Sequence, residues 1–556
     1  MLTFARTFIM DRFLQQYFRP LLALGIVLNA TGIFTQVFTG DSILYADIAK
    51  NMAQRNDWLN LFAYGKDWLD KPHFPFWMAA ISFKIFGINA FAYKLPAFLF
   101  WLAGIYYTYK IAAKLYNNGV AKCAALVYVI ALHGVISNFD VKAEPYLTTL
   151  IIAATYYILL AYREDKLSYI LMAALFSGFA VMTKGIFVLL TIAGGLALYF
   201  ILSRQWKEFF KVKWYLLIVL ILVVIFPELY ALYTQFDLHP EKVVFDKQNV
   251  SGIQFFLWDS QFGRFFNTGP IKGSGDNSFF LHTTLWAFLP WSVIFLFALL
   301  KGAKQLKLTG ERWILYGAAL LTFLIFSVSD FQLPHYIIIL FPHFSIAVAA
   351  YLSALAKTQT ARNLAIVQFV LFCLSVVFII LLSWLINNPG KYIVMAAGII
   401  IAGVCFLFTV NKKDSLHKTM LYSFAFACVL YPFMNLYFYP FLMQYQAGMK
   451  AAQDVNLTQE RYEHAMDHYS TQYRFYADKE PVTLTNMQDV SAFLEKENPR
   501  IFITQPTLDS LRMMNTKFNI LKAYNDFHVT KLSLNFLRDH TRENTLKKCY
   551  IITSVK

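Results

Sequence analysis

The chain has 556 residues, of which 58% are hydrophobic and only 15% are charged. This balance excludes an ordinary soluble globular protein and indicates a polytopic membrane protein. The formal net charge of +16 would suggest a nucleic-acid partner in a soluble chain. Here much of the excess lies in short loops between apolar segments, where it sets topology and attracts anionic lipid.

Apolar segments of membrane length follow one another along most of the chain, beginning near Phe18. No small-residue cleavage motif follows that start, so we expect a retained first helix rather than a signal peptide. Because a bilayer core needs roughly 20 apolar residues per helix, we expect about thirteen spans. Their predicted centres lie near residues 28, 102, 128, 153, 175, 194, 224, 290, 321, 346, 374, 400 and 429. The segment 74–87 is too short to span, and we expect an amphipathic helix in the membrane interface.

Basic residues concentrate in alternate loops, for example the one holding Arg204, Lys207, Lys211 and Lys213. The positive-inside rule places this set of loops in the cytoplasm. Two long segments, residues 40–90 and 237–278, then face the opposite side of the membrane. With an odd number of spans, the C-terminal region faces that side too.

The first of these segments has an unusual composition between Gly40 and Trp77. It reads GDSILYADIAKNMAQRNDWLNLFAYGKDWLDKPHFPFW, with many aspartates, lysines and tryptophans. Such residues are typical of a membrane surface. Tryptophan and apolar residues are too dense for a solvated linker. We therefore predict an ordered catalytic loop that lies against the bilayer.

The composition changes again near Gln444, where charge rises and short apolar runs replace the long ones. Residues 500–504 and 549–553 have the pattern of buried strands, and residues 490–496 show helical periodicity. We predict a membrane domain over residues 1–443 and a small soluble α/β domain over residues 444–556. The five cysteines show no paired spacing, so neither a disulfide framework nor a zinc site is indicated. We expect the soluble domain to cover the site or to face the acceptor.

Ionisable residues at membrane depth are costly and are functional candidates by default. Asp41 directly follows the first span and could act as a general base. It could equally be the N-cap of a helix that presents Tyr45 on one face, and both roles are compatible. Asp70 and Lys71 precede Pro72, which restricts the residue before it and would hold Lys71 in one direction. A fixed ammonium suits a phosphate, whereas a plain surface ion pair would contribute little.

Further candidates follow at the same outer level. Asp140 and Glu144 stand at the start of the fourth span, where a first-turn acid also has a purely structural explanation in the helix dipole. Arg264 lies between aromatic residues, a setting that suits a guanidinium gripping a phosphate. His282 is either a ligand or a satisfied interfacial residue. Lys184 interrupts apolar sequence before Gly185, which fits a tight turn; His335 and Tyr336 precede the tenth span.

Taken together, these residues resemble the GT-C superfamily of membrane glycosyltransferases. The nearest likeness is to the branch that holds the bacterial aminoarabinose (lipid A) transferases and the protein mannosyltransferases. The matching marks, in family order over about residues 18–350, are Asp41 with Tyr45; Asp70-Lys71-Pro72 with Phe76-Trp77; Phe86-Gly87; Lys94-Leu95-Pro96; Thr183-Lys184-Gly185; Arg264-Phe265; Leu289-Pro290-Trp291; and Leu333-Pro334-His335-Tyr336.

The resemblance implies a GT-C fold and transfer of a sugar, with inversion, from a polyprenyl-phosphate donor such as one built on undecaprenyl phosphate. The acceptor would be a lipid A-like glycolipid, another glycan or a protein, on the periplasmic side of a bacterial inner membrane. Asp41 matches the catalytic acidic residue, with Glu144 and Asp140 as further catalytic candidates. Tyr45, Lys71, Arg264, His335, Tyr336 and Lys184 are the candidates for holding the lipid phosphate and sugar.

Asp70 matches an acidic position that can share in a metal site, and His282 is a second candidate ligand. No cofactor is required by this scheme, and a divalent metal is compatible with it. No Gly-rich phosphate loop for a nucleotide is visible. The competing class is a membrane transporter or a flippase for lipid-linked sugars. Transporters usually show internal repeats with broken helices, and no such repeat is apparent in the sequence.

Overall fold

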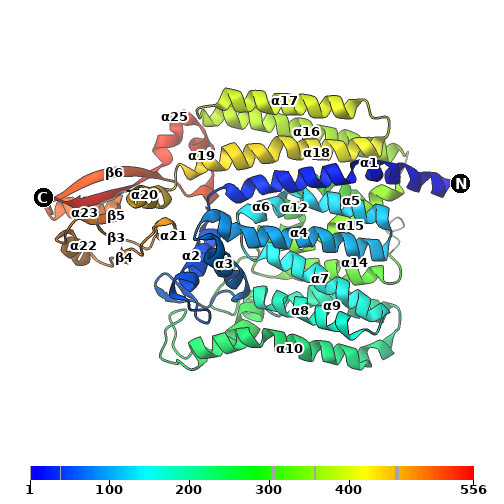
Figure 1. Ribbon diagram of the computed structural model, residues 1–556, viewed down its shortest axis with the longest axis horizontal. Coiled ribbons are helices and arrows are strands. Elements are labelled where there is room, and N and C mark those ends of the chain that lie inside the picture. The colour runs from blue at the N-terminus through cyan, green and yellow to red at the C-terminus, as the bar shows by residue number, and fades with distance from the viewer. Residues whose placement is uncertain (1, 38, 302–307, 356–357, 458–461, 556) are drawn as a thin grey trace.

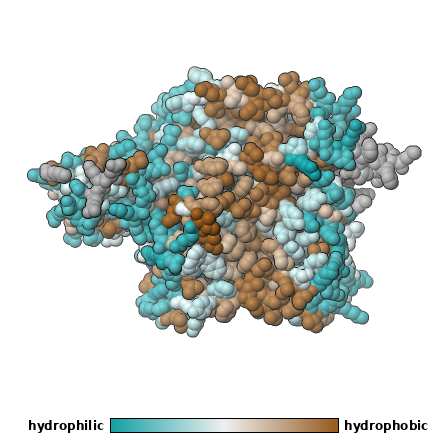
Figure 2. Space-filling model, in the orientation of Figure 1, coloured by the Kyte–Doolittle hydropathy of each residue, from teal (hydrophilic) through white to brown (hydrophobic). Residues whose placement is uncertain are grey.

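The computed structural model describes residues 2–37, 39–301, 308–355, 358–457 and 462–555. Most of the chain is a layered bundle of long helices, and a smaller sheet region projects from one end of it (Figure 1). Figure 2 shows a hydrophobic band across the middle of the bundle with hydrophilic surfaces at both ends. That distribution is the one expected of a protein whose bundle crosses a bilayer.

The bundle helices follow the apolar segments of the sequence. They are α1 (Leu2–Ala30), α4 (Ala90–Leu115), α5 (Asn118–Val129), α6 (Leu132–Phe139), α7 (Glu144–Arg163), α8 (Leu167–Lys184), α9 (Val188–Leu202), α10 (Val212–Leu232), α12 (Phe279–Ala287), α13 (Ser292–Lys301), α14 (Arg312–Val328), α15 (Phe341–Ala354), α16 (Gln359–Ile386), α17 (Lys391–Val410) and α18 (Ser415–Phe433). Short α19 (Tyr439–Met443) follows α18.

Every predicted span centre coincides with a helix except residue 290, which falls at the break between α12 and α13. Within the described ranges, eight helices are long and apolar enough to cross a membrane, or nine if the bent pair α5 and α6 counts as one span. Helices α9 and α14 are apolar but shorter. The chain is thus a multi-pass membrane protein, and the number thirteen stays a prediction.

The segment after the first span is ordered and consists of regular elements. Helix α2 (Gly40–Arg55) is followed by a small antiparallel hairpin, β1 (Phe62–Ala63) and β2 (Lys66–Asp67), and by α3 (Phe74–Phe86). Helix α3 buries Phe74, Phe76 and Phe83 and exposes Ile85 on its other side. One-sided burial fits the predicted interfacial helix.

Four short elements belong to the later segments of the chain. The π-helix η3 (Tyr233–Asp237) continues α10, and α11 (Gly252–Gln254) runs into the π-helix η4 (Phe255–Gly263). The 3₁₀ helix η5 (Pro334–Leu340) leads into α15. Their side chains lie over the same end of the bundle as α2 and α3.

The C-terminal region contains a five-stranded sheet of order β4-β3-β5-β7-β6. Its strands are β3 (Glu463–Met466), β4 (Val482–Thr483), β5 (Pro499–Thr504), β6 (Phe518–Asp526) and β7 (Lys547–Ser554). Strand β3 is parallel to β4 and β5, whereas β7 is antiparallel to β5 and β6. The two strands and the helix predicted here are present as β5, β7 and α22 (Met487–Leu494).

The side chains of β5 alternate between the two faces of the sheet, and helices cover both faces. Phe502 packs with α20 (Ala447–Asn456) and α21 (Thr471–Tyr476), while Ile501 and Ile503 pack with α22 and α23 (Gln505–Met513). Successive strand residues point to opposite faces, so each face has its own apolar core. The region is therefore a small α/β unit.

This α/β unit is fastened to α2 by buried charged residues. The Lys50 ammonium donates to the backbone carbonyls of Arg474, Phe475 and Ala477 at 2.8, 3.1 and 2.6 Å, at the C-terminal end of α21. Asp47, also on α2, accepts from the Tyr469 hydroxyl at 2.8 Å and pairs with Arg474 at 3.2 Å. Cations at a helix C-terminus satisfy carbonyls that the helix leaves unpaired.

Candidate active site

Nine of the predicted site residues line one cavity of about 120 Å³ at the end of the bundle. They are Asp41, Tyr45, Asp70, Lys71, Glu144, Lys184, Arg264, His335 and Tyr336. They come from α2, the loop before α3, the starts of α7 and η5, the end of α8, and the residue after η4. An adjoining cavity of about 110 Å³ shares six of them and continues between α9, α12 and α14.

Asp70 stands between two cations and lines both cavities with them. Its Oδ2 accepts from Lys71 Nζ at 2.6 Å, and its Oδ1 pairs with Arg264. The Arg264 guanidinium also lies over the Phe331 ring at 5.4 Å, and its Nε is buried without a hydrogen-bond partner among the described residues. A buried unpaired donor next to two cations is suited to a bound anion.

The environment of this trio changes the pKa of two of its members. Burial alone raises the pKa of Asp70, but the charges of Lys71 and Arg264 outweigh it and lower the pKa to about 2. Burial lowers the pKa of Lys71 to about 8, with Arg264 and Lys184 acting in the same direction and Asp70 opposing them. Lys71 therefore loses its positive charge as the pH rises through about 8.

A second ion pair lies deeper, at the start of α7. The Glu144 carboxylate is buried and accepts from Lys184 Nζ at 2.6 Å. His335 Nε2 lies 3.8 Å from the same carboxylate, and Lys184 Nζ lies 4.1 Å from the centre of the Tyr336 ring. The pairing occupies Glu144, so the structure favours a role in fixing Lys184 over the predicted catalytic role.

The turn after Lys184 is held by η4. Gly185 has a φ of +99°, and an added Cβ would come within 2.1 Å of the Gln261 amide nitrogen. That amide donates to the Lys184 carbonyl at 3.1 Å. Only glycine meets both conditions, which confirms the predicted tight turn, and the Gln261 amide joins this turn to η4.

Asp41 lies in the first turn of α2 with an exposed side chain that faces the cavity. The N-cap is Thr39, so the alternative that Asp41 caps this helix is wrong. No residue that the structure describes donates a hydrogen bond to its carboxylate. Tyr45, one turn later, packs edge to face against Trp68 and Phe76 at 6.1 and 5.4 Å. The carboxylate is therefore available to a reactant, and Tyr45 fixes the wall beside it.

Two predicted residues do not line the cavity. Asp140 accepts a hydrogen bond from Thr39 and pairs with Lys142 at 3.1 Å. It therefore holds the beginning of α2 rather than lining the cavity. His282 lies exposed on α12, beside Phe279 at 5.3 Å. Lys142 does line the cavity, and the sequence signal for it was that few lysines occur in the outer loops.

The predicted metal ligands do not form a metal site. Within the described part of the chain, no group of three or more His, Cys, Asp and Glu residues is arranged to hold a metal ion. Both Asp70 oxygens already pair with cations, and His282 is not part of the cavity wall. A divalent cation prefers several oxygen ligands without competing cations, so these residues do not fit one.

Known proteins are similar to this chain in sequence and in fold. A family model described as dolichyl-phosphate-mannose-protein mannosyltransferase matches residues 70–230. An undecaprenyl phosphate-alpha-4-amino-4-deoxy-L-arabinose arabinosyl transferase of Yersinia enterocolitica is 23% identical over 354 residues, which is 62% of this chain and 61% of that protein. A protein of Aquifex aeolicus is 27% identical over 344 residues, 60% of this chain and 63% of that protein. Each match therefore spans less than two thirds of the relative's length.

The crystal structure of ArnT from Cupriavidus metallidurans bound to undecaprenyl phosphate has a similar fold. The TM-score is 0.71 at 16% identity, and the match covers 96% of this chain and 97% of that chain. The apo structure of the same protein also gives a TM-score of 0.71. The chain therefore shares the fold of the solved ArnT structures, and over residues 70–230 it is similar to the matched mannosyltransferase family.

Proposed function

We propose that the chain transfers a sugar from a polyprenyl-phosphate donor to an acceptor on the outer side of a bacterial inner membrane. The observation that carries this proposal is the trio of Lys71, Arg264 and Asp70, which lines both an apolar cavity and the adjoining cavity that Asp41 lines. The similarity to an undecaprenyl phosphate-alpha-4-amino-4-deoxy-L-arabinose arabinosyl transferase, and to the ArnT structure bound to undecaprenyl phosphate, supports a lipid phosphate as donor.

The cavity has the two surfaces that a lipid phosphate needs. Its lining combines the cations Lys71, Lys184 and Arg264 with an apolar set, Phe187, Val188, Leu190, Phe280, Ile325, Phe326 and Ile339. An isoprenoid chain would lie along this apolar wall and bring its phosphate to Lys71 and Arg264. The orphaned Arg264 Nε would become a donor to a phosphate oxygen.

The transfer itself then follows from charge placement. The bond between the anomeric carbon and the phosphate oxygen breaks as negative charge grows on the phosphate, which Lys71 and Arg264 stabilise in a water-poor site. The acceptor hydroxyl or amine attacks from the opposite side of the sugar, with inversion, and its proton passes to Asp41. Polyprenyl phosphate leaves, and no nucleotide is consumed.

The acceptor, whether a lipid A-like glycolipid, another glycan or a protein, belongs to this proposal as a class only. The direct experiment uses the full chain in lipid nanodiscs with an undecaprenyl-phosphate sugar and an envelope extract as the acceptor pool. Mass spectrometry should detect free undecaprenyl phosphate and a sugar-bearing product. Movement of the donor across proteoliposome membranes without release of its phosphate would instead support a flippase and overturn the proposal.

A further inference from the structure

One buried ionisable pair takes no part in the proposed reaction. His73, directly after Pro72, and Glu228 of α10 are both completely buried. The His73 Nδ1 lies 3.0 Å from Glu228 Oε1, and the His73 backbone N–H donates to Oε2 at 3.0 Å. The other ring nitrogen, Nε2, lies 2.9 Å from the Leu59 carbonyl. Both ring nitrogens and both carboxylate oxygens are thus engaged.

The chemistry of these contacts sets the protonation of the pair. A carbonyl only accepts, so Nε2 must carry a hydrogen. The Glu228 carboxylate accepts from the backbone through Oε2, and its Oε1 accepts from Nδ1 when that nitrogen carries a hydrogen as well. Burial alone lowers the pKa of His73, but Glu228 and the Leu59 carbonyl outweigh it and raise the pKa above its ordinary value. His73 is therefore an imidazolium locked between two acceptors.

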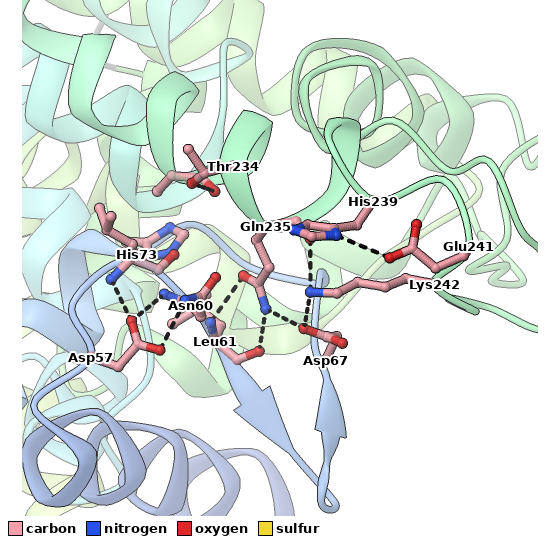
Figure 3. Close-up of polar contacts among 12 residues, drawn as sticks. Asp57, Asn60, Leu61, Asp67, His73, Thr234, Gln235, His239, Glu241 and Lys242 are labelled. Carbon is pink, nitrogen blue, oxygen red and sulfur yellow. Dashed lines mark hydrogen bonds and ion pairs between the residues drawn. The ribbon is translucent and has the colours of Figure 1, made fainter.

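A second set of contacts holds the preceding hairpin to the continuation of the same helix. Gln235 of η3 accepts from Leu61 N at 3.0 Å and donates to the Leu61 carbonyl at 2.9 Å (Figure 3). Its amide also donates to Asp67, and Lys242 Nζ reaches the same carboxylate, both at 2.9 Å. The short stretch 68–72, which carries Asp70 and Lys71, is therefore anchored at both ends to one helix and its extension.

We propose that His73 is a positioning residue: held between Glu228 and Leu59, it fixes the direction of Lys71 toward the bound phosphate without touching the substrate. Pro72 joins the two residues, and its ring restricts the backbone so that the anchor at His73 determines where Lys71 points. The identity of the phosphate ligand rests on the proposed function. The anchoring itself rests only on the contacts described above.

The experiment compares two variants of the full chain in nanodiscs. His73→Phe keeps a ring but removes every ring hydrogen bond. Glu228→Gln removes the charges but can keep the contacts, because its amide accepts from the His73 backbone and donates to Nδ1 of a neutral imidazole. The readouts are the Kd for undecaprenyl phosphate and the pH dependence of Lys71 acylation, followed by mass spectrometry. Lys71 faces Asp70, Arg264 and Lys184, which all stay unchanged.

His73→Phe should weaken undecaprenyl phosphate binding by about 10²-fold, the scale of loss from a misplaced group, and should shift the labelling profile of Lys71. Glu228→Gln should keep the Kd for undecaprenyl phosphate within a few-fold of the wild type and should keep the labelling profile of Lys71. Wild-type affinity together with an unchanged labelling profile in His73→Phe would overturn the inference, even with a lowered unfolding temperature. Should His73→Phe fail to fold, His73→Gln is judged by the same two readouts. Failure of the wild type to bind undecaprenyl phosphate would reject the proposed function, while the labelling profile would still decide the role of His73.

Discussion

Replacing Lys71 by arginine tests the phosphate-holding role through pH. The lowered pKa of Lys71, about 8, means that its charge is present below that pH and is lost as the pH rises through it. The ratio kcat/KM reports the free enzyme, and in the wild type it should fall about tenfold between pH 8 and pH 9.5. The reason is that only a few per cent of Lys71 stays protonated at pH 9.5. Arginine stays charged throughout, so Lys71→Arg should show no alkaline fall, whatever its activity at neutral pH.

The assay is initial-rate sugar transfer at low donor concentration from pH 6 to pH 10 in nanodiscs. Lys166→Arg is the matched control, because Lys166 is largely exposed and pairs only with nearby Glu164. That variant should keep the wild-type profile. An alkaline fall that persists unchanged in Lys71→Arg would refute the reasoning, because the titrating group would then lie elsewhere.

Three further outcomes follow from the site and from the α/β unit. Asp41→Asn should lower kcat by at least about 10²-fold, the usual scale of general-base catalysis, with unchanged Kd for undecaprenyl phosphate; wild-type turnover would exclude Asp41 as base. Arg264→Lys should raise that Kd, because a point charge cannot replace a bidentate donor, and equal affinity would argue against guanidinium contact. Lys50→Met should cost about 1–3 kcal/mol for each buried carbonyl left without a donor, and three carbonyls lose theirs. Limited proteolysis between the membrane domain and the α/β unit should then become faster, and unchanged cleavage would show that Lys50 does not hold the unit.

Much of the site was predictable from the sequence because its residues interrupt apolar segments. A charge such as Asp41, Lys71 or Arg264 at membrane depth is costly, so it attracts attention without any knowledge of its partners. The strands β5 and β7 were predictable for a similar reason, since their apolar runs are short and bounded by polar residues. The convergence of Asp41, Lys71 and Arg264 on one cavity was also expected, and all three line it.

The pairing of distant residues was not predictable in the same way. His73 and Glu228 are separated by 155 positions, and neither periodicity nor spacing relates them. The role of Asp140 was misjudged because the hydroxyl that it accepts from, Thr39, is 101 positions earlier. Span counting failed to match the helices fully where the chain breaks, as at residue 290 between α12 and α13. Such contacts depend on the packed arrangement of helices rather than on local pattern.

The carboxylate between Lys71 and Arg264 has a consequence for turnover. Asp70 is a counter-ion tethered beside its own cations, so an incoming phosphate must displace it, and it can return whenever the phosphate leaves. Such an internal competitor limits how tightly the spent carrier lipid is retained. Neutralising it, as in Asp70→Asn, would leave an enzyme that binds polyprenyl phosphate more tightly and releases it more slowly.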